Sequence, residues 1–200
     1  MTSHNDPTHD RIVAAALRVI NNAGTSSVRV IEVCKEAEVS QGMIRYHFGD
    51  RQGLIDAALA RRFGERFGEF LTVFAASVAD CSDEKQFRQV VQKIIDAIFR
   101  PERTVTRFQR NSDVGEAANR PPLAQKIAVE RDAAVHALSN IIIDAQSRGL
   151  MRSDVDPFVV AAFHNAVVHG YSVFEVGNRS LDTAAFVELY RRALFGLIFN

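Results

Sequence analysis

The sequence predicts an all-α protein of about nine helices, and three observations on its 200 residues support this fold class. Apolar residues recur at intervals of three and four along most of the chain, which is the spacing of one face of a helix. No stretch alternates polar and apolar residues between hairpin turns, as strands do. Clusters of proline, glycine, asparagine and aspartate separate the periodic stretches, as helix ends and turns require.

The composition restricts the class of protein. The apolar fraction of 47% is ordinary for a globular protein, and no apolar run is long enough to cross a membrane. The polar stretch Met1 to Asp10 lacks the apolar core of an export signal, so we expect a cytoplasmic protein. Cys34 and Cys81 are the only cysteines, and they suggest neither a disulfide framework nor a metal-binding pair. No cofactor or metal is expected.

The first three helices are predicted to form a small N-terminal unit. Asp6-Pro7 offers an N-cap and a first-turn proline for a helix that ends at Gly24. A second helix is expected over about 30–37 and a third over about 41–47. A helix of about seven residues is too short to be stable alone, so the third needs the other two as a scaffold.

A long fourth helix is predicted to begin at an Asp50 cap. Along it Phe63, Phe67, Phe70 and Phe74 follow one another at intervals that place four rings on one side. Core packing is the favoured interpretation of these rings, and lining of an apolar ligand cavity is the alternative. Both can hold at once.

The remaining chain predicts five more helices. The fifth, sixth and seventh are expected to end near Phe99, Glu116 and Gly149, and the last two to cover about 157–177 and 183–199. These last two are apolar on almost every side. A helix apolar all round must be buried all round, so we expect them to pack on the core with one face and on a second copy with the other.

The chemistry of the third helix suits duplex DNA. Gln41 can pair with adenine, and Arg45 can donate two hydrogen bonds to the O6 and N7 atoms of guanine. Tyr46 and His47 can bond to phosphates. The net charge of this region does not support DNA binding further, since residues 1–60 hold six Arg or Lys against seven Asp or Glu. DNA contacts would therefore depend on local arginines and helix N-termini rather than on a broad basic surface.

Residues 6–66 resemble the DNA-binding domain of the TetR family of bacterial repressors. The resemblance rests on the Ala-rich first helix with its terminal glycine and on a series of spaced motifs, namely Val33-Cys34, Ala37-x-Val39-Ser40, Gly42-x-Ile44-x-Tyr46-His47-Phe48 and Arg51-x-x-Leu54. It implies a helix-turn-helix over about 29–48. Residues 67–200 resemble the family in outline only, and would form its effector-binding and dimerisation domain.

The resemblance also implies the DNA-contacting residues. These are Arg29, Ser40, Gln41, Gly42, Met43, Arg45, Tyr46, His47 and Arg51. Arg51 falls where the family usually has a phosphate-binding lysine, and Gly42 would let the backbone approach DNA closely. Tyr46 and Phe48 could instead be packing residues that seat the third helix, and His47 could be an ordinary surface histidine.

Three positions depart from the family pattern. Arg29 replaces a threonine that typically caps the second helix, so a cap is lost where a phosphate-binding charge is gained. Glu38 stands where the turn usually has glycine, at a position expected to need a positive φ and therefore to be strained. Arg45 replaces the usual tyrosine, which makes it the first candidate for sequence-specific readout.

Candidate ligand contacts are drawn from the fourth, sixth and eighth helices: Phe67, Phe70, Phe74, Arg107, Phe108, Asn111, Phe163, His164, Asn165 and His169. The polar residues of the eighth helix could equally be bonded within the core or a dimer interface, and more remotely hold a metal. No catalytic motif is present, so an enzyme is not expected.

These expectations combine into a homodimeric transcriptional regulator, a repressor that a small-molecule effector releases from a palindromic operator. Control by a protein partner is the principal alternative, and a filled core without a cavity would favour it. A helical enzyme that carries this N-terminal module and an architectural DNA binder are further alternatives.

Overall fold

The structure, a computed structural model, describes residues 6–177 and 181–199 and divides into two compact units. Unit 1 contains the chain up to residue 65 together with 113–130, and unit 2 contains residues 66–112 and 131 onward. Every regular element of the described residues is helical, which confirms the all-α class. The sequence placed a boundary near residue 66 and did not assign 113–130 to the N-terminal unit.

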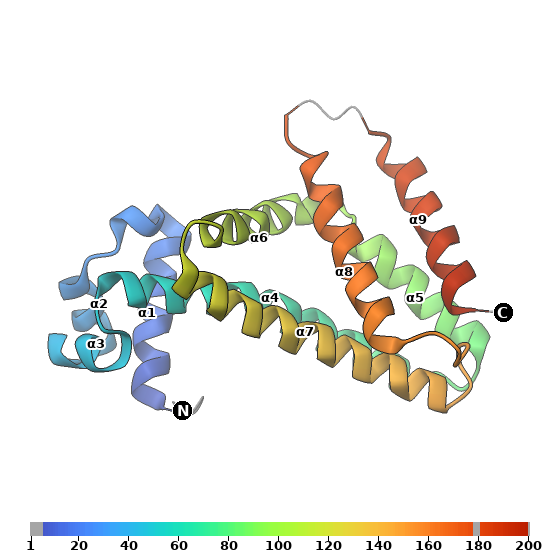
Figure 1. Ribbon diagram of the computed structural model, residues 1–200, viewed down its shortest axis with the longest axis horizontal. Coiled ribbons are helices and arrows are strands. Elements are labelled where there is room, and N and C mark those ends of the chain that lie inside the picture. The colour runs from blue at the N-terminus through green and yellow to red at the C-terminus, as the bar shows by residue number, and fades with distance from the viewer. Residues whose placement is uncertain (1–5, 178–180, 200) are drawn as a thin grey trace. The chain divides into compact units, whose positions relative to one another are not determined.

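Nine α-helices and two 3₁₀ turns follow one another along the described chain (Figure 1). They are α1 Pro7–Ala23, η1 Thr25–Ser27, α2 Val30–Ala37, α3 Gln41–Phe48, α4 Arg51–Ala79, α5 Glu84–Ile98, η2 Pro101–Arg103, α6 Thr104–Ala117, α7 Pro121–Ser147, α8 Pro157–Val173 and α9 Thr183–Ile198.

Aspartate side chains begin several of these helices. Asp6 accepts a hydrogen bond from the Thr8 amide at 2.8 Å, and Asp156 accepts from the first-turn amides of α8. Asp50 accepts from the Gly53 amide at 2.8 Å, as expected for the cap of α4. A Cβ on Gly53 would lie 2.0 Å from the carbonyl oxygen of Phe48, so only glycine permits this tight entry into α4.

The core of unit 1 joins α1, α2, α3 and the first half of α4. Ile12, Val33, Ile44 and Leu54, one from each helix, are all almost fully buried. Phe63, the first of the four phenylalanines of α4, is 1% exposed, so core packing is the correct interpretation for this ring. Burying one such side chain stabilises the fold by roughly 1.5–3 kcal/mol, which is how three short helices hold together.

The turn between α2 and α3 has the strained backbone that the sequence predicts. Glu38 ends α2 with φ 54° and ψ 50°, and it is the only non-glycine residue of the described chain with a positive φ. A left-handed conformation costs an ordinary L-residue roughly 1–2 kcal/mol. The turn keeps this geometry because Val39 donates to the carbonyl of Cys34 at 2.9 Å and so closes the helix end.

Replacing Glu38 by glycine is expected to stabilise the protein by about 0.5–1 kcal/mol. Glycine removes the left-handed penalty but adds entropy to the unfolded chain, which offsets part of the gain. Urea unfolding of Glu38→Gly measures the change, with Glu38→Ala as the control because alanine keeps the penalty. Equal stability of the two variants would contradict this account.

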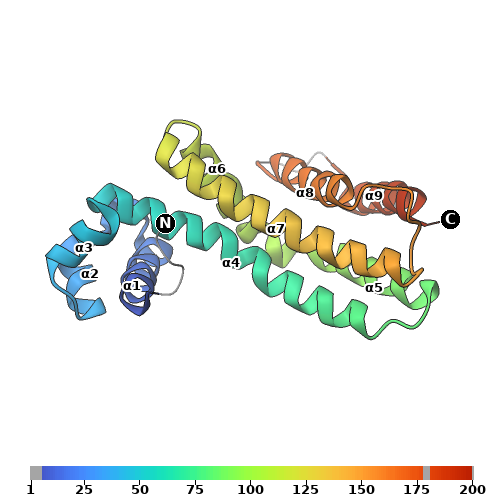
Figure 2. The ribbon, with the colours of Figure 1, turned by 60° about the horizontal axis from the view of Figure 1, so that its bottom comes forward.

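Unit 2 is built from the second halves of α4 and α7, most of α6, and the whole of α5, α8 and α9. Its buried core includes Phe74, Phe87, Ile95, Ala161 and Leu194. The helices α8 and α9 run antiparallel beside each other in both ribbon views (Figures 1 and 2). His164 of α8 contacts the Tyr190 hydroxyl of α9, and Tyr171 and Thr183 are bonded at 2.8 Å.

The helix α8 is shorter than the sequence predicts. It ends at Val173 rather than near 177, because Phe174 and Glu175 turn back to the carbonyls of Tyr171 and Ser172. Gly177 then takes a positive φ of 75°. This early end turns the Glu175 carboxylate toward α6, where it meets an arginine.

Candidate nucleic-acid interface and ligand pocket

The short helix α3 is anchored by one side chain and presents the opposite face to solvent. Ile44 is 2% exposed and holds α3 on the core of unit 1. Gln41, Gly42, Arg45 and Tyr46 are all exposed, and they fall at i, i+4 spacing on the outer face. Tyr46 is 81% exposed, so the packing alternative for this residue is wrong.

His47 lies apart from the exposed face of α3. Its side chain is 9% exposed, and Nε2 lies 3.7 Å from a carboxylate oxygen of Asp6, the cap of α1. The amide of Thr8 lowers the pKa of Asp6, so a carboxylate anion faces the imidazole ring. His9 packs on the neighbouring Phe48 with ring centroids 4.9 Å apart. The interpretation of His47 as a surface histidine is therefore wrong, whereas its contact with phosphate stays a prediction.

Arg51 holds the segment between α1 and α2. Its Nε donates to the carbonyl of Val28 at 2.8 Å, and Nη2 donates to the carbonyls of Thr25 and Ser26 at 2.9 and 3.2 Å. The Nη1 group makes no hydrogen bond within the described residues and stays available for the predicted phosphate contact. Arg51 thus has a structural role that the sequence did not reveal.

The starts of α2 and α3 carry no side-chain cap. Arg29 precedes α2 and donates instead to the Ser26 carbonyl at 2.9 Å, which agrees with the expected loss of a cap at this position. Ser40 precedes α3 in extended conformation without a cap bond from its hydroxyl. Uncapped amide groups in a first turn are donors that an anion can use.

Two buried ion pairs fasten residues 113–130 within unit 1. Arg62 of α4 pairs with Asp113, whose side chain is 1% exposed, and Asp56 pairs with Arg120. A buried carboxylate without its partner is costly, so each pair ties the later segment firmly to α4. Neither pair was predicted.

A pocket with a cavity of about 70 Å³ opens in unit 2 among α4, α6, α7 and α8. Five predicted ligand residues line it: Phe67, Phe70, Arg107, His164 and Asn165. Phe74 lines a second, apolar pocket with a cavity of about 60 Å³, and Phe70 and His164 border both.

Four other predicted ligand residues line neither of these pockets: Phe108, Asn111, Phe163 and His169. Phe163 is 38% exposed on the outer side of α8. Asn111 and His169 are bonded to each other at 3.1 Å, and Asn111 also donates to the Ser172 hydroxyl. For these two polar residues the alternative of bonded residues within the fold is the one that the geometry supports.

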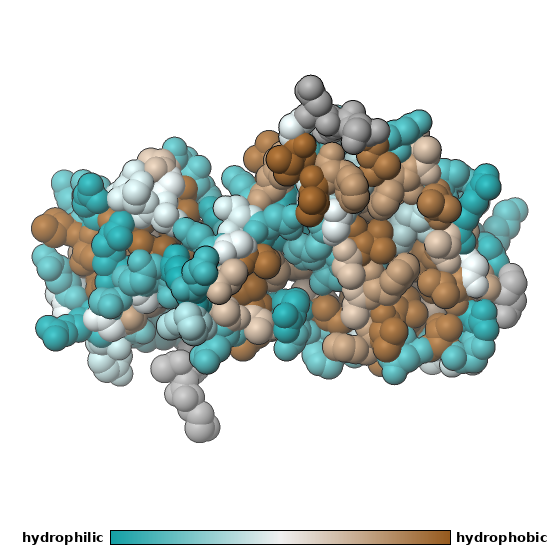
Figure 3. Space-filling view, turned by 45° about the horizontal axis from the view of Figure 1, so that its top comes forward, coloured by the Kyte–Doolittle hydropathy of each residue, from teal (hydrophilic) through white to brown (hydrophobic). Residues whose placement is uncertain are grey.

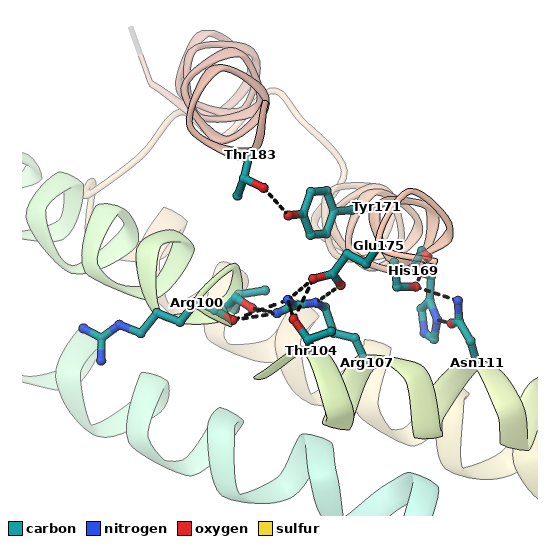
Figure 4. A network of polar contacts seen from close by, with 10 residues as sticks. Arg100, Thr104, Arg107, Asn111, His169, Tyr171, Glu175 and Thr183 are labelled. Carbon is teal, nitrogen blue, oxygen red and sulfur yellow. Dashed lines mark hydrogen bonds and ion pairs between the residues drawn. The ribbon is translucent and has the colours of Figure 1, made fainter. Parts of the chain in front are cut away.

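A buried ion pair is the centre of the polar network in unit 2 (Figure 4). Arg107 and Glu175 are 5% and 2% exposed and form two hydrogen bonds of 2.6 Å. Arg107 also donates to the Ile98 carbonyl at 2.6 Å, and Thr104 donates to Glu175 at 2.8 Å. Arg107 borders the pocket, but its guanidinium is already bound.

Three further arginines line the first pocket and were not predicted. Arg66 comes from α4, Arg103 from η2 and Arg110 from α6. A detectable signal was present in the sequence, because 103, 107 and 110 recur at intervals of four and three and so share one helix face.

Burial keeps the two histidines of α8 neutral near pH 7. Desolvation, and secondly the charge of Arg110, lower the pKa of His164 and of His169 to about 4. Burial also raises the pKa of Tyr190, whose hydroxyl meets His164.

These histidines are expected to make the fold acid-sensitive between pH 7 and pH 5. Their folded pKa values lie below the ordinary 6.5, so the unfolded chain binds more protons in this range and stability falls with pH. Each histidine should account for about 2 kcal/mol of the loss by pH 5. Urea unfolding at several pH values should show that the free energy of unfolding depends less steeply on pH in His169→Gln than in the wild type. The exposed His136 gives the control, since His136→Gln should keep the wild-type dependence.

The remaining features of the described chain concern metal ligands, thiols and long apolar helices. Among residues 6–177 and 181–199, no group of three His, Cys, Asp or Glu could hold a metal ion. Cys34 and Cys81 are buried free thiols, and burial raises the pKa of each. None of the described helices is both long and apolar enough to cross a membrane.

Comparisons with known proteins agree with this geometry. The family model for bacterial regulatory proteins of the tetR family matches residues 12–58. The transcriptional repressor NicS of Pseudomonas putida is 28% identical over 151 residues, which cover 75% of this chain and 68% of NicS. The transcriptional regulator YttP of Bacillus subtilis is 31% identical over 101 residues, and the match spans about half of each chain, 50% and 48%.

A crystal structure of a TetR-family regulator from Rhodococcus sp. extends the similarity to the whole fold. It superposes with a TM-score of 0.63 at 26% identity and covers 95% of both chains. The family model covers residues of unit 1 alone, whereas the similarity to this structure extends over both units. Residues 12–58 thus match the tetR family of bacterial regulatory proteins, and over its whole length the chain is similar to TetR-family transcriptional regulators.

Proposed function

We propose that the protein is a homodimeric repressor that binds a palindromic operator and leaves it when a small-molecule effector binds in unit 2. The observation that carries this proposal is the two-sided helix α3, with Ile44 buried beneath and Gln41, Arg45 and Tyr46 exposed. A short helix held rigidly from below, with long polar side chains outside, suits insertion into the major groove.

Each exposed group of the helix-turn-helix has a role in this proposal. Arg45 reads guanine and Gln41 reads adenine, while Tyr46 and Arg29 bind phosphates. The remaining predicted contacts come from Ser40, Gly42, Met43, His47 and Arg51. Since unit 1 lacks a basic excess, base readout should contribute more than bulk charge, and the salt dependence should be modest.

The helices α8 and α9 are the proposed dimer surface. Their outer faces expose large apolar side chains, among them Val159, Val173, Phe174 and Leu189, and Figure 3 shows apolar side chains gathered on this part of unit 2. A contiguous apolar surface of this kind marks an interaction site. A twofold dimer would bring two recognition helices to half-sites about one DNA turn apart, roughly 34–36 Å.

Effector release is proposed to act through α4. This single helix begins in unit 1 and continues into unit 2, where Phe67, Phe70 and Phe74 border the two pockets. A ligand that shifts the second half of α4 would move the first half with it. To do so it must bind the released state more tightly than the operator-bound state. The presence of pockets favours a small ligand over a protein partner as the effector. The description of NicS as a repressor supports repression rather than activation.

Selection of bound sequences from a random duplex library, at physiological salt, tests the proposal. A palindromic motif is the expected result, together with a dimer in analytical ultracentrifugation. Leu189→Glu should give a monomer that loses operator binding, whereas Val105→Glu, which alters an equally exposed residue of α6, should not. A motif without twofold symmetry, or a monomeric wild-type protein, would overturn the dimer. No enrichment over random sequence would overturn operator binding itself.

A further inference from the structure

The first pocket of unit 2 has an unusual charge. Four arginines line it, at positions 66, 103, 107 and 110, and none of its lining residues is acidic. Arginines that border an apolar cavity are normally paired, because an uncompensated charge removed from water is expensive.

Two of these arginines lack an acidic partner. Glu175 neutralises Arg107, as described above. For Arg103 and Arg110, by contrast, no carboxylate of the described residues lies within 4.0 Å. Each guanidinium instead lies near an aromatic ring, Arg103 at 5.8 Å from the Phe70 centroid and Arg110 at 4.0 Å from that of Phe67.

The environment of Arg110 is electrostatically unfavourable. Desolvation, and then repulsion by the neighbouring arginines, lower its pKa to about 10. An anion bound beside Arg103 and Arg110 would offset both costs by its attraction to the two guanidinium groups, which form strong charge-assisted hydrogen bonds to carboxylate and phosphate oxygens.

The second pocket adds an apolar extension to this charged site. Apart from His164, every residue that lines it is apolar, and the lining comes from α4, α5, α7, α8 and α9. The side chains of Phe70, Leu138 and His164 border both pockets, so the two spaces are neighbours. A ligand that fills both needs a charged end and a long apolar end.

We propose that unit 2 binds an elongated anionic amphiphile. Its anionic head lies between Arg103 and Arg110, and its acyl chain extends past Phe70 into the apolar pocket. This inference rests on the proposed function, because it names the chemical class of the effector. It excludes a cationic effector, which the arginines would repel, and a small polar anion, which would leave the apolar pocket empty.

Three probes that share one ten-carbon chain test the proposal by isothermal titration calorimetry. They are decanoate, 1-decanol and decyltrimethylammonium, which carry a negative, a neutral and a positive head. We expect decanoate to bind at least tenfold more tightly than 1-decanol, and the cation to bind least. Acetate, the head without the chain, should not bind detectably.

Replacing Arg110 by methionine is expected to remove the preference for decanoate over 1-decanol. The variant should keep the alcohol's affinity, since the apolar pocket is intact, and its melting temperature without ligand should be no lower than that of the wild type. Arg103→Met should likewise reduce the preference for decanoate over 1-decanol. Arg100→Met is the matched control, because the Arg100 side chain is exposed and points away from the network in Figure 4.

The outcomes separate this inference from the proposed function. Equal affinity for the three probes, or a preference that survives in Arg110→Met, would overturn it. Failure of decanoate to bind a protein that still selects its operator would overturn the inference alone. Decanoate binding that leaves operator binding unchanged would support the ligand class and contradict effector release.

Discussion

Replacing Glu175 by glutamine is expected to destabilise the protein by about 3–5 kcal/mol, because it leaves the Arg107 charge buried without a counter-ion. Arg107 and Glu175 are almost fully buried and share two hydrogen bonds of 2.6 Å. A domain is typically stable by only about 5–15 kcal/mol, so this one substitution would remove a large part of the total.

Urea unfolding followed by circular dichroism measures this loss. Glu102→Gln is the control, since it makes the same change of charge at an exposed position of η2. The double variant Arg107→Met with Glu175→Leu should recover most of the stability, because removing both charges also removes the cost of burying them. A loss below about 1 kcal/mol in Glu175→Gln would mean that the pair is hydrated, as surface pairs are.

Replacing Arg45 by alanine is expected to weaken operator binding by about 1–3 kcal/mol for each half-site, or about 2–6 kcal/mol for a dimer on a palindrome. At about 1.4 kcal/mol per factor of ten, this is a loss of roughly 30-fold to 20,000-fold. The preference for one base pair in each half-site should disappear with it. The reason is that Arg45 is exposed on the outer face of α3, where its two donors can reach a guanine.

Binding to the selected operator and to its single-base variants measures both effects. Arg45→Lys keeps the charge but loses the paired donors, so it should lose base preference while it retains the salt dependence. Tyr46→Phe should weaken binding to all of these sequences by the same factor. If Arg45→Ala also weakened binding to all of them by the same factor, the contact of Arg45 would be with phosphate and not with a base.

The parts of the fold that the sequence predicts are those that depend on near neighbours. The caps at Asp6 and Asp156 and the positive φ of Glu38 are local, because each is set by residues within one turn. The end of α8 was placed too late because it depends on Glu175, whose partner Arg107 lies far away in the sequence.

The site was predictable only in part for a related reason. Arg51 binds the backbone carbonyls of Thr25, Ser26 and Val28. Every residue has a backbone carbonyl, so the identity of these residues gives no sign of the contact. The pairs Arg62–Asp113 and Asp56–Arg120 require knowledge of which helices meet. The phenylalanines of α4 were identified as pocket candidates because their spacing is visible in one helix. The spacing of 103, 107 and 110 places three arginines on one face, but only the structure shows that this face borders the pocket together with Arg66 of α4.

The chain crosses between the two compact units three times, within α4, α6 and α7. Unit 1 is therefore not one continuous stretch of the gene. A fragment cut after residue 66 would lack Asp113 and Arg120 and would leave their buried partners unmatched. A chimaera that transfers this DNA-binding module to another regulator must carry residues 113–130 along with the first 65, so the module is inherited as two separated pieces of sequence.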